Sequence, residues 1–537
     1  MAVAAFLTRL LPLSISSFPY NNDSLTECSI ASQILSSGVL DSVSEAPWSL
    51  SHSLATPGLN VLLAFVAGCL GSTPLAVAQW IGAVLSALTI STIFLVGVKI
   101  SGSLSGGITA SFGAVMMGTF IFTTGSVWKE ALGISLMVLV LYAYLQREEL
   151  RFRVLALIGL MLLPFVHHLV AVITLLFTGY MLVWSWYYAI SNIGPRKRHF
   201  LDLLLVAVPS AEAAIYYSLV SFDRYAMFST PTRLLLFLVS FTVFSVVAMY
   251  VLSINKHSKL SFAPLLFVIV FVLVLLDYFG MLFPYSPSSD WYFILVIASL
   301  FLVSLAWYGT ELSLDENHMY RAIQVGLLVS PLTIVTLGVS EGFTLSANQI
   351  FYRTFDFLDI FIFLGIGFAI AHLSIKRRYL SRFLAVGLII SLVVSFPFAY
   401  YTQPLLGVRH DTQSYEVDAI DWVVRVNNVP CVVSDERISY IAVSMFGVAK
   451  ASYLPSDMLK NVSLASLYIL DNNLFEDSWT TTGVNAYPFG LIVLPQQNYT
   501  WIKEAGNVVY IGGPTEDHIV NVLGSRLGET AIYGNTH

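Results

Sequence analysis

The chain has 537 residues, of which 57% are hydrophobic and 11% are charged, and its net charge is −6. Soluble domains carry roughly 25% charged residues, so a chain of this composition cannot bury its apolar surface in its own core and needs lipid as its solvent. The sequence has no basic stripe with interleaved aromatic residues, which excludes nucleic acid as a partner. Its three cysteines match no metal-ligand spacing.

Apolar runs long enough to cross a bilayer, about 17 to 25 residues each, fill the first 401 residues. The first run contains Arg9, and we interpret it as a membrane helix because the Ser-Ile-Ser motif at 14–16 fits a signal-peptide cleavage site poorly. A shorter run at 153–166 is joined to the next by His167 and His168. The long runs lie near 2–18, 77–98, 105–123, 130–147, 168–189, 200–220, 233–254, 261–283, 290–308, 321–339, 354–374 and 383–401.

The charges of the loops decide whether a further apolar run at 59–73 also crosses. Lys and Arg gather in cytoplasmic loops, and residues 18–76 contain neither. Successive membrane helices place their ends on alternate sides. With the loop at Arg147 in the cytoplasm, residues 18–76 are external only if the run at 59–73 does not cross the membrane and lies on its outer surface. The sequence therefore predicts a polytopic α-helical plasma-membrane protein of about 13 transmembrane helices, with a cytoplasmic N-terminus. Its large first external loop, 18–76, contains a juxtamembrane helix.

The chain changes character after residue 401, so we divide it into a transmembrane domain, 1–401, and a C-terminal domain, 402–537. The second part contains 14 acidic and 7 basic residues, a net charge of −7, whereas the first is close to neutral. Short apolar runs at 430–434, 465–470, 490–494 and 507–511 follow an amphipathic stretch at 413–426. This pattern predicts a small extracytoplasmic α/β domain.

Two carboxylates stand four residues apart near the start of the first external loop. Asp23 and Glu27 open a predicted helix that runs to Gly38. A carboxylate at this position can act as a general base toward an acceptor hydroxyl. The alternative is that Asp23 caps the helix and that the helix dipole favours Glu27.

Charged and histidine side chains mark other points near the outer surface. Lys129 in the second external loop can face a lipid phosphate or pair with its neighbour Glu130. His167 and His168, in the elbow between two helices, can bind a metal, a phosphate or an acceptor, or can form a hydrogen-bonded turn.

A helix that enters the membrane from outside carries three charges at a spacing of three residues. These are Arg353, Asp356 and Asp359. Charges in such a place are usually functional or paired. Arg353 suits bidentate phosphate binding, and an internal pair with Asp356 is the alternative.

These features follow one another in a characteristic order. Arg9-Leu10-Leu11-Pro12-Leu13 lies in the first helix, Asp23 opens the external loop, and Pro57-Gly58-Leu59 begins the juxtamembrane helix. This order resembles the GT-C superfamily of membrane glycosyltransferases, which includes protein O-mannosyltransferases and archaeal oligosaccharyltransferases. The segment 126–130 and the His167-His168 elbow are similar to archaeal members. The resemblance covers residues 1–190, and the later helices in outline.

The resemblance implies an enzyme that uses a polyprenyl (dolichyl) phosphate-linked sugar and a protein or lipid glycan acceptor at the outer membrane face. It implies that Asp23 is the catalytic base or a metal-associated carboxylate, and it leaves a divalent metal open. The residues that it implies as contacts to the donor or the acceptor are Glu27, Lys129, Glu130, His167, His168 and Arg353.

The chain also departs from the family pattern. An Asp-x-Asp pair is absent from the loop at 124–130, and the Trp-Trp-Asp signature of oligosaccharyltransferases is absent from the C-terminal segment. Transfer of a single sugar is therefore favoured over block transfer of an oligosaccharide. The alternatives are a noncatalytic membrane scaffold with a surface-binding outer domain, and a transporter or flippase of lipid-linked saccharides. Ionisable residues within the membrane are few, which weakens the transporter alternative.

Overall fold

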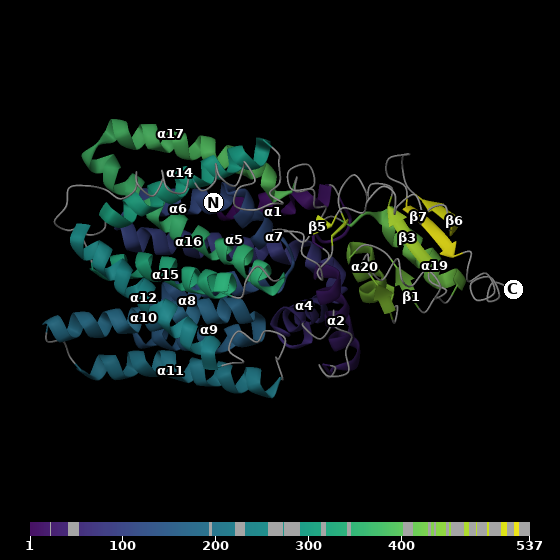
Figure 1. Ribbon diagram of the computed structural model, residues 1–537, viewed down its shortest axis with the longest axis horizontal. Helices are drawn as coiled ribbons and strands as arrows, with labels where there is room; N and C mark the ends of the chain where they lie inside the picture. Colours follow the sequence, from purple (N-terminus) through teal and green to yellow (C-terminus); the bar gives the residue numbers. More distant parts are fainter. Residues whose placement is uncertain are drawn as a thin grey trace.

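The computed structural model shows a bundle of long helices beside a smaller α/β domain (Figure 1). At the end of the bundle that faces this domain lie α2 (Asp23–Ser37) and α4 (Gly58–Leu70). The residues that the structure describes are 1–14, 16–21, 23–40, 53–192, 196–220, 231–255, 272, 290–312, 318–340, 345–400, 412–427, 431–433, 436–446, 450–452, 467–471, 479–480, 491–492, 506–512 and 520–525.

The bundle helices follow the predicted apolar runs. They are α1 (Ala2–Leu10), α5 (Pro74–Ser101), α6 (Leu104–Met116), α7 (Gly118–Gly125), α8 (Lys129–Leu145), α9 (Leu150–Val166), α10 (His168–Asn192), α11 (Arg196–Leu219), α12 (Pro231–Asn255), α14 (Asp290–Leu312), α15 (His318–Ser340), α16 (Leu345–Lys376) and α17 (Arg378–Ser395). The run predicted at 261–283 lies outside the described residues, apart from position 272.

Several of these helices are long and apolar enough to cross a membrane, as expected of a polytopic membrane protein. Five described stretches meet this condition, and α6 and α7 together form a sixth that is bent by 73°. The predicted number of about 13 spans remains a prediction. The five stretches are Pro74–Ser101, His168–Trp186, Phe200–Leu219, Asp356–Lys376 and Arg378–Ser395.

The first apolar run forms a shorter helix than the sequence pattern predicts. After the 9 residues of α1, the chain tightens into a 3₁₀-helix, η1 (Leu11–Ser14), that contains Pro12. An α-helix rises about 1.5 Å per residue, so these two elements together are too short to cross a hydrocarbon core of about 30 Å. A single straight span at 2–18 is therefore wrong.

The run predicted as one continuous span at 105–123 is broken at Met117, whose backbone is extended. Gly118 packs directly against the carbonyl of Ser395, where a β-carbon would clash. This close approach holds the start of α7 against the end of α17.

Arg9 supplies the partners that this break requires. The last carbonyls of a helix have no partner within the helix, and Arg9 donates to the carbonyls of Ala114 (2.9 Å) and Val115 (3.0 Å) in the last turn of α6. It also donates to the hydroxyl of Thr124 in α7 (3.2 Å). Arg9, the charged residue of the first apolar run, thus provides hydrogen bonds to the C-terminal end of α6.

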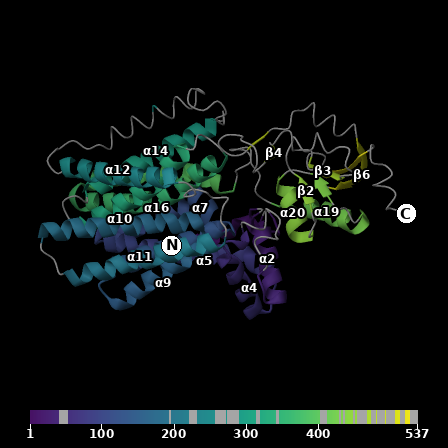
Figure 2. The same cartoon turned by 60° about the horizontal axis from the view of Figure 1, so that its bottom comes forward.

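The helix α4 ends after 13 residues for reasons that can be read in the sequence. Gly71 is left-handed (φ 61°), and the amides of Gly71 and Ser72 bond back to Gly68 and Ala67, the hydrogen-bond pattern of a Schellman motif. Thr73 then caps α5, where its hydroxyl accepts from the amide of Ala76 (3.2 Å). Figure 2 shows α4 running across the end of the bundle. Its place on a membrane surface remains a prediction.

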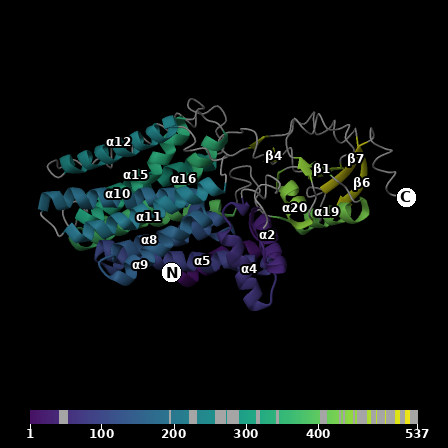
Figure 3. The ribbon, with the colours of Figure 1, turned by 90° about the horizontal axis from the view of Figure 1, so that it is seen from below.

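The C-terminal domain, by which we mean the described elements from residue 412 onward, lies beyond α2 at the end of the bundle (Figure 3). It contains α19 (Ser414–Asn427), α20 (Glu436–Phe446) and a five-stranded mixed sheet in the order β2-β1-β3-β7-β6. The expected boundary at 401/402 falls in 401–411, outside the described residues. The strands are β1 (Cys431–Val433), β2 (Lys450–Ser452), β3 (Leu467–Asp471), β6 (Gly506–Gly512) and β7 (Val520–Ser525), with β4 (Trp479–Thr480) and β5 (Leu491–Ile492) in a separate antiparallel pair.

The pairing directions of the strands identify two parts of the sheet. The strand β1 pairs in parallel with β2 and β3, whereas β3, β7 and β6 pair in antiparallel. Parallel strands need a crossover, and α20 provides the one between β1 and β2. The helix α20 was not predicted from the sequence.

Candidate functional site

Asp23 is the first residue of α2, but it does not cap this helix. The cap comes from Asn21, whose side-chain oxygen accepts from the amide of Asp23 (3.2 Å) and whose carbonyl accepts from the amide of Ser24 (3.1 Å). Asn21 is buried and left-handed, with φ 85°, a conformation that costs energy in residues other than glycine and that clusters at functional sites. Asp23 is half-buried, and among the described residues none forms a hydrogen bond with its carboxylate.

Glu27, one turn along α2, is fully engaged with the loop that leads to α4. It is 3% exposed. One carboxylate oxygen accepts from the hydroxyl of Ser53 (2.9 Å), and the other accepts from the side-chain amide of Asn60, which also donates to the backbone carbonyl of Glu27 (3.1 Å). These contacts favour a role in positioning α2 over direct contact with a substrate.

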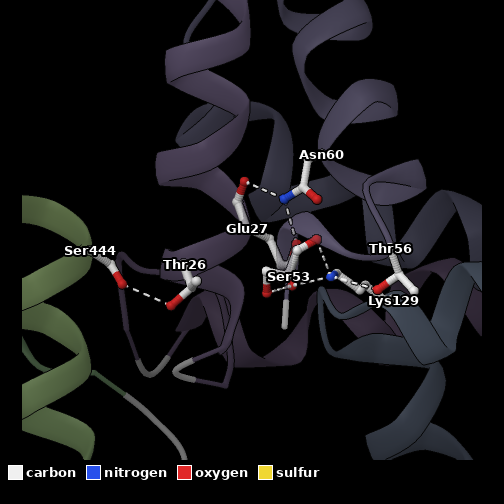
Figure 4. Close-up of polar contacts among 7 residues, drawn as sticks. All are labelled: Thr26, Glu27, Ser53, Thr56, Asn60, Lys129 and Ser444. Atoms are coloured by element: carbon white, nitrogen blue, oxygen red, sulfur yellow. Dashed lines mark hydrogen bonds and ion pairs between the residues drawn. The ribbon is translucent and has the colours of Figure 1, made fainter. Parts of the chain in front are cut away.

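Lys129, at the start of α8, joins the same buried network (Figure 4). Its ammonium donates to the carbonyl of Ser53 (2.6 Å) and to the hydroxyl of Thr56 (2.9 Å), and it lies 3.7 Å from Glu27. An ammonium group has three donors, and these contacts direct them at the protein. The salt bridge to Glu27 replaces the pair with the neighbouring Glu130 that the sequence suggested as an alternative.

The charges near Asp23 come from helices that are far apart in the sequence. Arg353 of α16 and Lys129 of α8 both act electrostatically on Asp23 and on His168. Arg353 also acts on Glu130. The structure therefore brings these five predicted residues into one electrostatic neighbourhood, whereas their roles toward a substrate remain proposals.

Two opposing effects set the pKa values of the carboxyls in α2. Burial raises the pKa of Asp23 above its ordinary value, and the positive charges of Arg353 and Lys129 lower it in part. Burial also raises the pKa of Glu27, and Lys129 with the hydrogen bonds from Ser53 and Asn60 counteracts the shift. A carboxyl of raised pKa next to cations is a candidate for proton transfer.

The histidine elbow has a clear structural part. The imidazole of His167 accepts from the amide of Val170 (3.4 Å) through its Nδ1 atom, and so caps the start of α10. His168 stacks on His167, with ring centroids 4.9 Å apart. This supports the hydrogen-bonded turn for His167, while His168 is the histidine influenced by the cations near Asp23.

Glu130 is buried like Glu27, but the hydrogen bonding of the two carboxylates differs. It is 2% exposed, and neither carboxylate oxygen has a hydrogen-bond partner among the described residues.

Asp356 and Asp359 in α16 accept hydrogen bonds from Thr123 and Thr119 of α7, the latter at 3.0 Å. Asp356 is thus tied to α7 rather than engaged only with Arg353.

The described part of the chain contains no group of three or more His, Cys, Asp or Glu side chains arranged to hold a metal ion. Ser53, Thr56 and Asn60 were not predicted as members of this site from the sequence. A signal was present for Asn60, which is a polar residue within the apolar run at 59–73.

The fold is identified by its similarity to solved structures. No protein-family profile and no curated protein matches the sequence. Among solved structures, the oligosaccharyltransferase of Archaeoglobus fulgidus with zinc and sulfate is 12% identical, with a TM-score of 0.54, and the alignment covers 88% of this chain and 67% of that one. The chain has the GT-C fold.

Two further structures of the Archaeoglobus fulgidus enzyme show the same GT-C architecture. The apo form is 10% identical, with a TM-score of 0.52 over 88% of this chain and 69% of that one. A complex with an inhibitory peptide and a dolichol-phosphate is 12% identical, with a TM-score of 0.50 over 85% and 66%. The chain spans about two thirds of the length of these structures, and at such identities the likeness establishes the GT-C fold alone.

Proposed function

We propose that the chain is a membrane glycosyltransferase that transfers a sugar from a polyprenyl phosphate donor to an acceptor at the outer membrane face. The observation that carries the proposal is Asp23, whose carboxylate forms no hydrogen bond with described residues and lies near Arg353 and Lys129. The GT-C fold supports it, since one structure with this fold holds a dolichol-phosphate and an inhibitory peptide.

The proposed reaction assigns one step to Asp23 and another to Arg353. Asp23 takes the proton from the acceptor nucleophile as this nucleophile forms a bond to the anomeric carbon of the sugar. The bond between that carbon and the phosphate oxygen breaks, and the polyprenyl phosphate leaves with the electron pair. Arg353 suits the leaving phosphate, because its planar guanidinium can donate two parallel hydrogen bonds to phosphate oxygens.

Glu27, Lys129, Glu130 and His168 have supporting roles in the proposed reaction. Glu27 and Lys129 hold α2 against α8, as their mutual contacts support. Glu130 and His168 remain candidates for contact with the donor or the acceptor. Arg353, which acts electrostatically on Asp23, also acts on both of them. The proposed acceptor is a protein or a lipid glycan.

The direct test is sugar transfer by membranes that contain the full chain. Membranes are incubated with a panel of polyprenyl phosphates carrying single radiolabelled sugars, and the label is followed into protein and into lipid glycans. We expect incorporation from at least one donor. Correctly folded protein that incorporates no label from any donor would contradict the proposal and favour the noncatalytic scaffold.

The charge of Arg353 leads to a prediction for the dependence on pH. As a base, Asp23 works when deprotonated, so activity is present above its pKa and lost below it. Arg353 lowers that pKa, so Arg353→Gln is expected to move the acid limb of the kcat/KM profile to higher pH. The loss of a charged hydrogen bond to the donor phosphate is expected to raise the donor KM about tenfold. Both are measured by transfer assays across the acid range.

The matched control is Arg425→Gln. Arg425 is an exposed arginine of α19 that pairs with Asp421 (2.8 Å), and it is not among the charges that act on Asp23. This variant should leave the profile where it is in wild type. An acid limb that stays in place in Arg353→Gln would remove Arg353 from the surroundings of the catalytic base.

A further inference from the structure

The first two turns of α2 are largely buried, whereas the rest of the helix is largely exposed. Residues 24–28, 30 and 31 are all buried, and residues 35–37 are exposed. A helix that faces protein all round must have a neighbour on each side. The buried part is also the part that begins with Asp23.

The bundle covers one side of this segment. Glu27 bonds to the loop before α4 and pairs with Lys129. Cys28 and Ala31 pack in a hydrophobic cluster with Leu59 of α4 and with α5. These contacts fix the position of α2 relative to the membrane helices.

The C-terminal domain covers the other side. Leu25, which is 1% exposed, packs in a hydrophobic cluster with Ile420 of α19 and Ile441 of α20. Its neighbour Thr26 shares a hydrogen bond with Ser444 of α20, with 2.8 Å between the hydroxyl oxygens (Figure 4). Leu25 and Thr26 follow Asp23 by two and three residues, so this contact lies within one turn of the carboxylate.

We propose that the C-terminal domain is a positioning element for Asp23, which it acts on through Leu25 and Thr26. This inference rests on the proposed function. The domain does not touch the reacting atoms, but α19 and α20 complete the enclosure that gives the first turn of α2 one orientation. A displacement of about 1 Å in a catalytic group can cost a hundredfold in rate. Loosening this contact therefore lowers kcat and leaves the donor KM unchanged.

A wedge at the contact tests the proposal in the full-length protein. Ser444→Trp places a large side chain where Ser444 is buried against Thr26. Ser414→Trp makes the same change at an exposed position at the start of α19. We expect the amides of residues 24–31 to exchange hydrogen about tenfold faster in Ser444→Trp than in Ser414→Trp. The measurement is hydrogen–deuterium exchange in detergent micelles.

Transfer kinetics give the second readout. With a donor that supports wild-type transfer, Ser444→Trp is expected to lower kcat about tenfold or more at an unchanged donor KM, and Ser414→Trp to match wild type. A variant that was merely less stable would lose folded protein, and its kcat per folded molecule would not change. Ser444→Thr, which keeps the hydroxyl, should restore most of the rate.

The two readouts separate this inference from the proposed function. Equal exchange in the two tryptophan variants would overturn the positioning role, whatever the activity. Faster exchange at residues 24–31 with an unchanged kcat would overturn it as well. If wild type transfers no sugar from any donor, the proposed function fails, and the exchange experiment alone then decides whether the domain orders the first turn of α2.

Discussion

Asp23→Asn is expected to lower kcat for sugar transfer about a hundredfold to ten-thousandfold, the range that general acid–base catalysis contributes. Asparagine has the same shape but cannot accept the acceptor's proton. The fold should persist, because Asn21 and not Asp23 caps α2, and because the Asp23 carboxylate forms no hydrogen bond with the described residues. The measurement is single-turnover transfer from the polyprenyl phosphate donor that is most active with wild type.

The matched control for this change is Asp418→Asn. Asp418 is exposed on α19, so the same loss of one negative charge is made away from the bundle. Its transfer rate should equal that of wild type. If Asp23→Asn and Asp418→Asn both transferred sugar at the wild-type rate, Asp23 would have no part in the chemistry, and another carboxylate, with Glu130 as the next candidate, would need to be tested.

Lys129→Met is expected to destabilise the protein by about 3–5 kcal/mol, because it leaves Glu27 as a buried carboxylate without its cation. The side chains of Lys129 and Glu27 are 5% and 4% exposed, so water cannot replace the lost charge. The double variant Glu27→Gln/Lys129→Met should lose less stability than the two single variants summed, because it removes both charges. Equilibrium unfolding in mixed micelles measures the four proteins of this cycle.

An exposed ion pair supplies the comparison for this cycle. Arg151 and Glu149 lie 2.7 Å apart, with side chains that are 76% and 52% exposed. Exposed pairs contribute about 0.2–1 kcal/mol, so Arg151→Met should change stability far less than Lys129→Met. Equal effects of the two substitutions, or strict additivity in the cycle, would show that Glu27 and Lys129 are not coupled.

The local parts of this architecture could be predicted from the sequence. The residues Gly71 to Pro74 end one helix and start the next, and this explains why the apolar run at 59–73 forms the separate helix α4. The helix α2 was predicted from its acidic start to Gly38, and it ends at Ser37 before a left-handed Gly38. Each of these features is determined by residues within a few positions of each other.

The tertiary parts could not be predicted, because their partners are far apart in the chain. Lys129 has Glu130 beside it in sequence, but it pairs with Glu27, 102 positions away. The break at Met117 depends on the approach of Gly118 to Ser395, which leaves no pattern in the apolar run itself. The capping of α2 by Asn21 could in principle be read locally, yet Asp23 is an equally good cap on residue type.

The bonds from Arg9 to α6 have a consequence for how the chain is assembled in the bilayer. In the predicted topology α6 lies in the hydrocarbon core, which offers no water to pair with the carbonyls of Ala114 and Val115. A break at Met117 is therefore costly in lipid until α1, which is synthesised earlier, has packed beside it. We expect biogenesis to follow this order: α1 enters the membrane first, and α6 and α7 complete their insertion by packing against it. A fusion or deletion that displaces α1 is therefore expected to cause misinsertion of the chain around Met117 as its first effect.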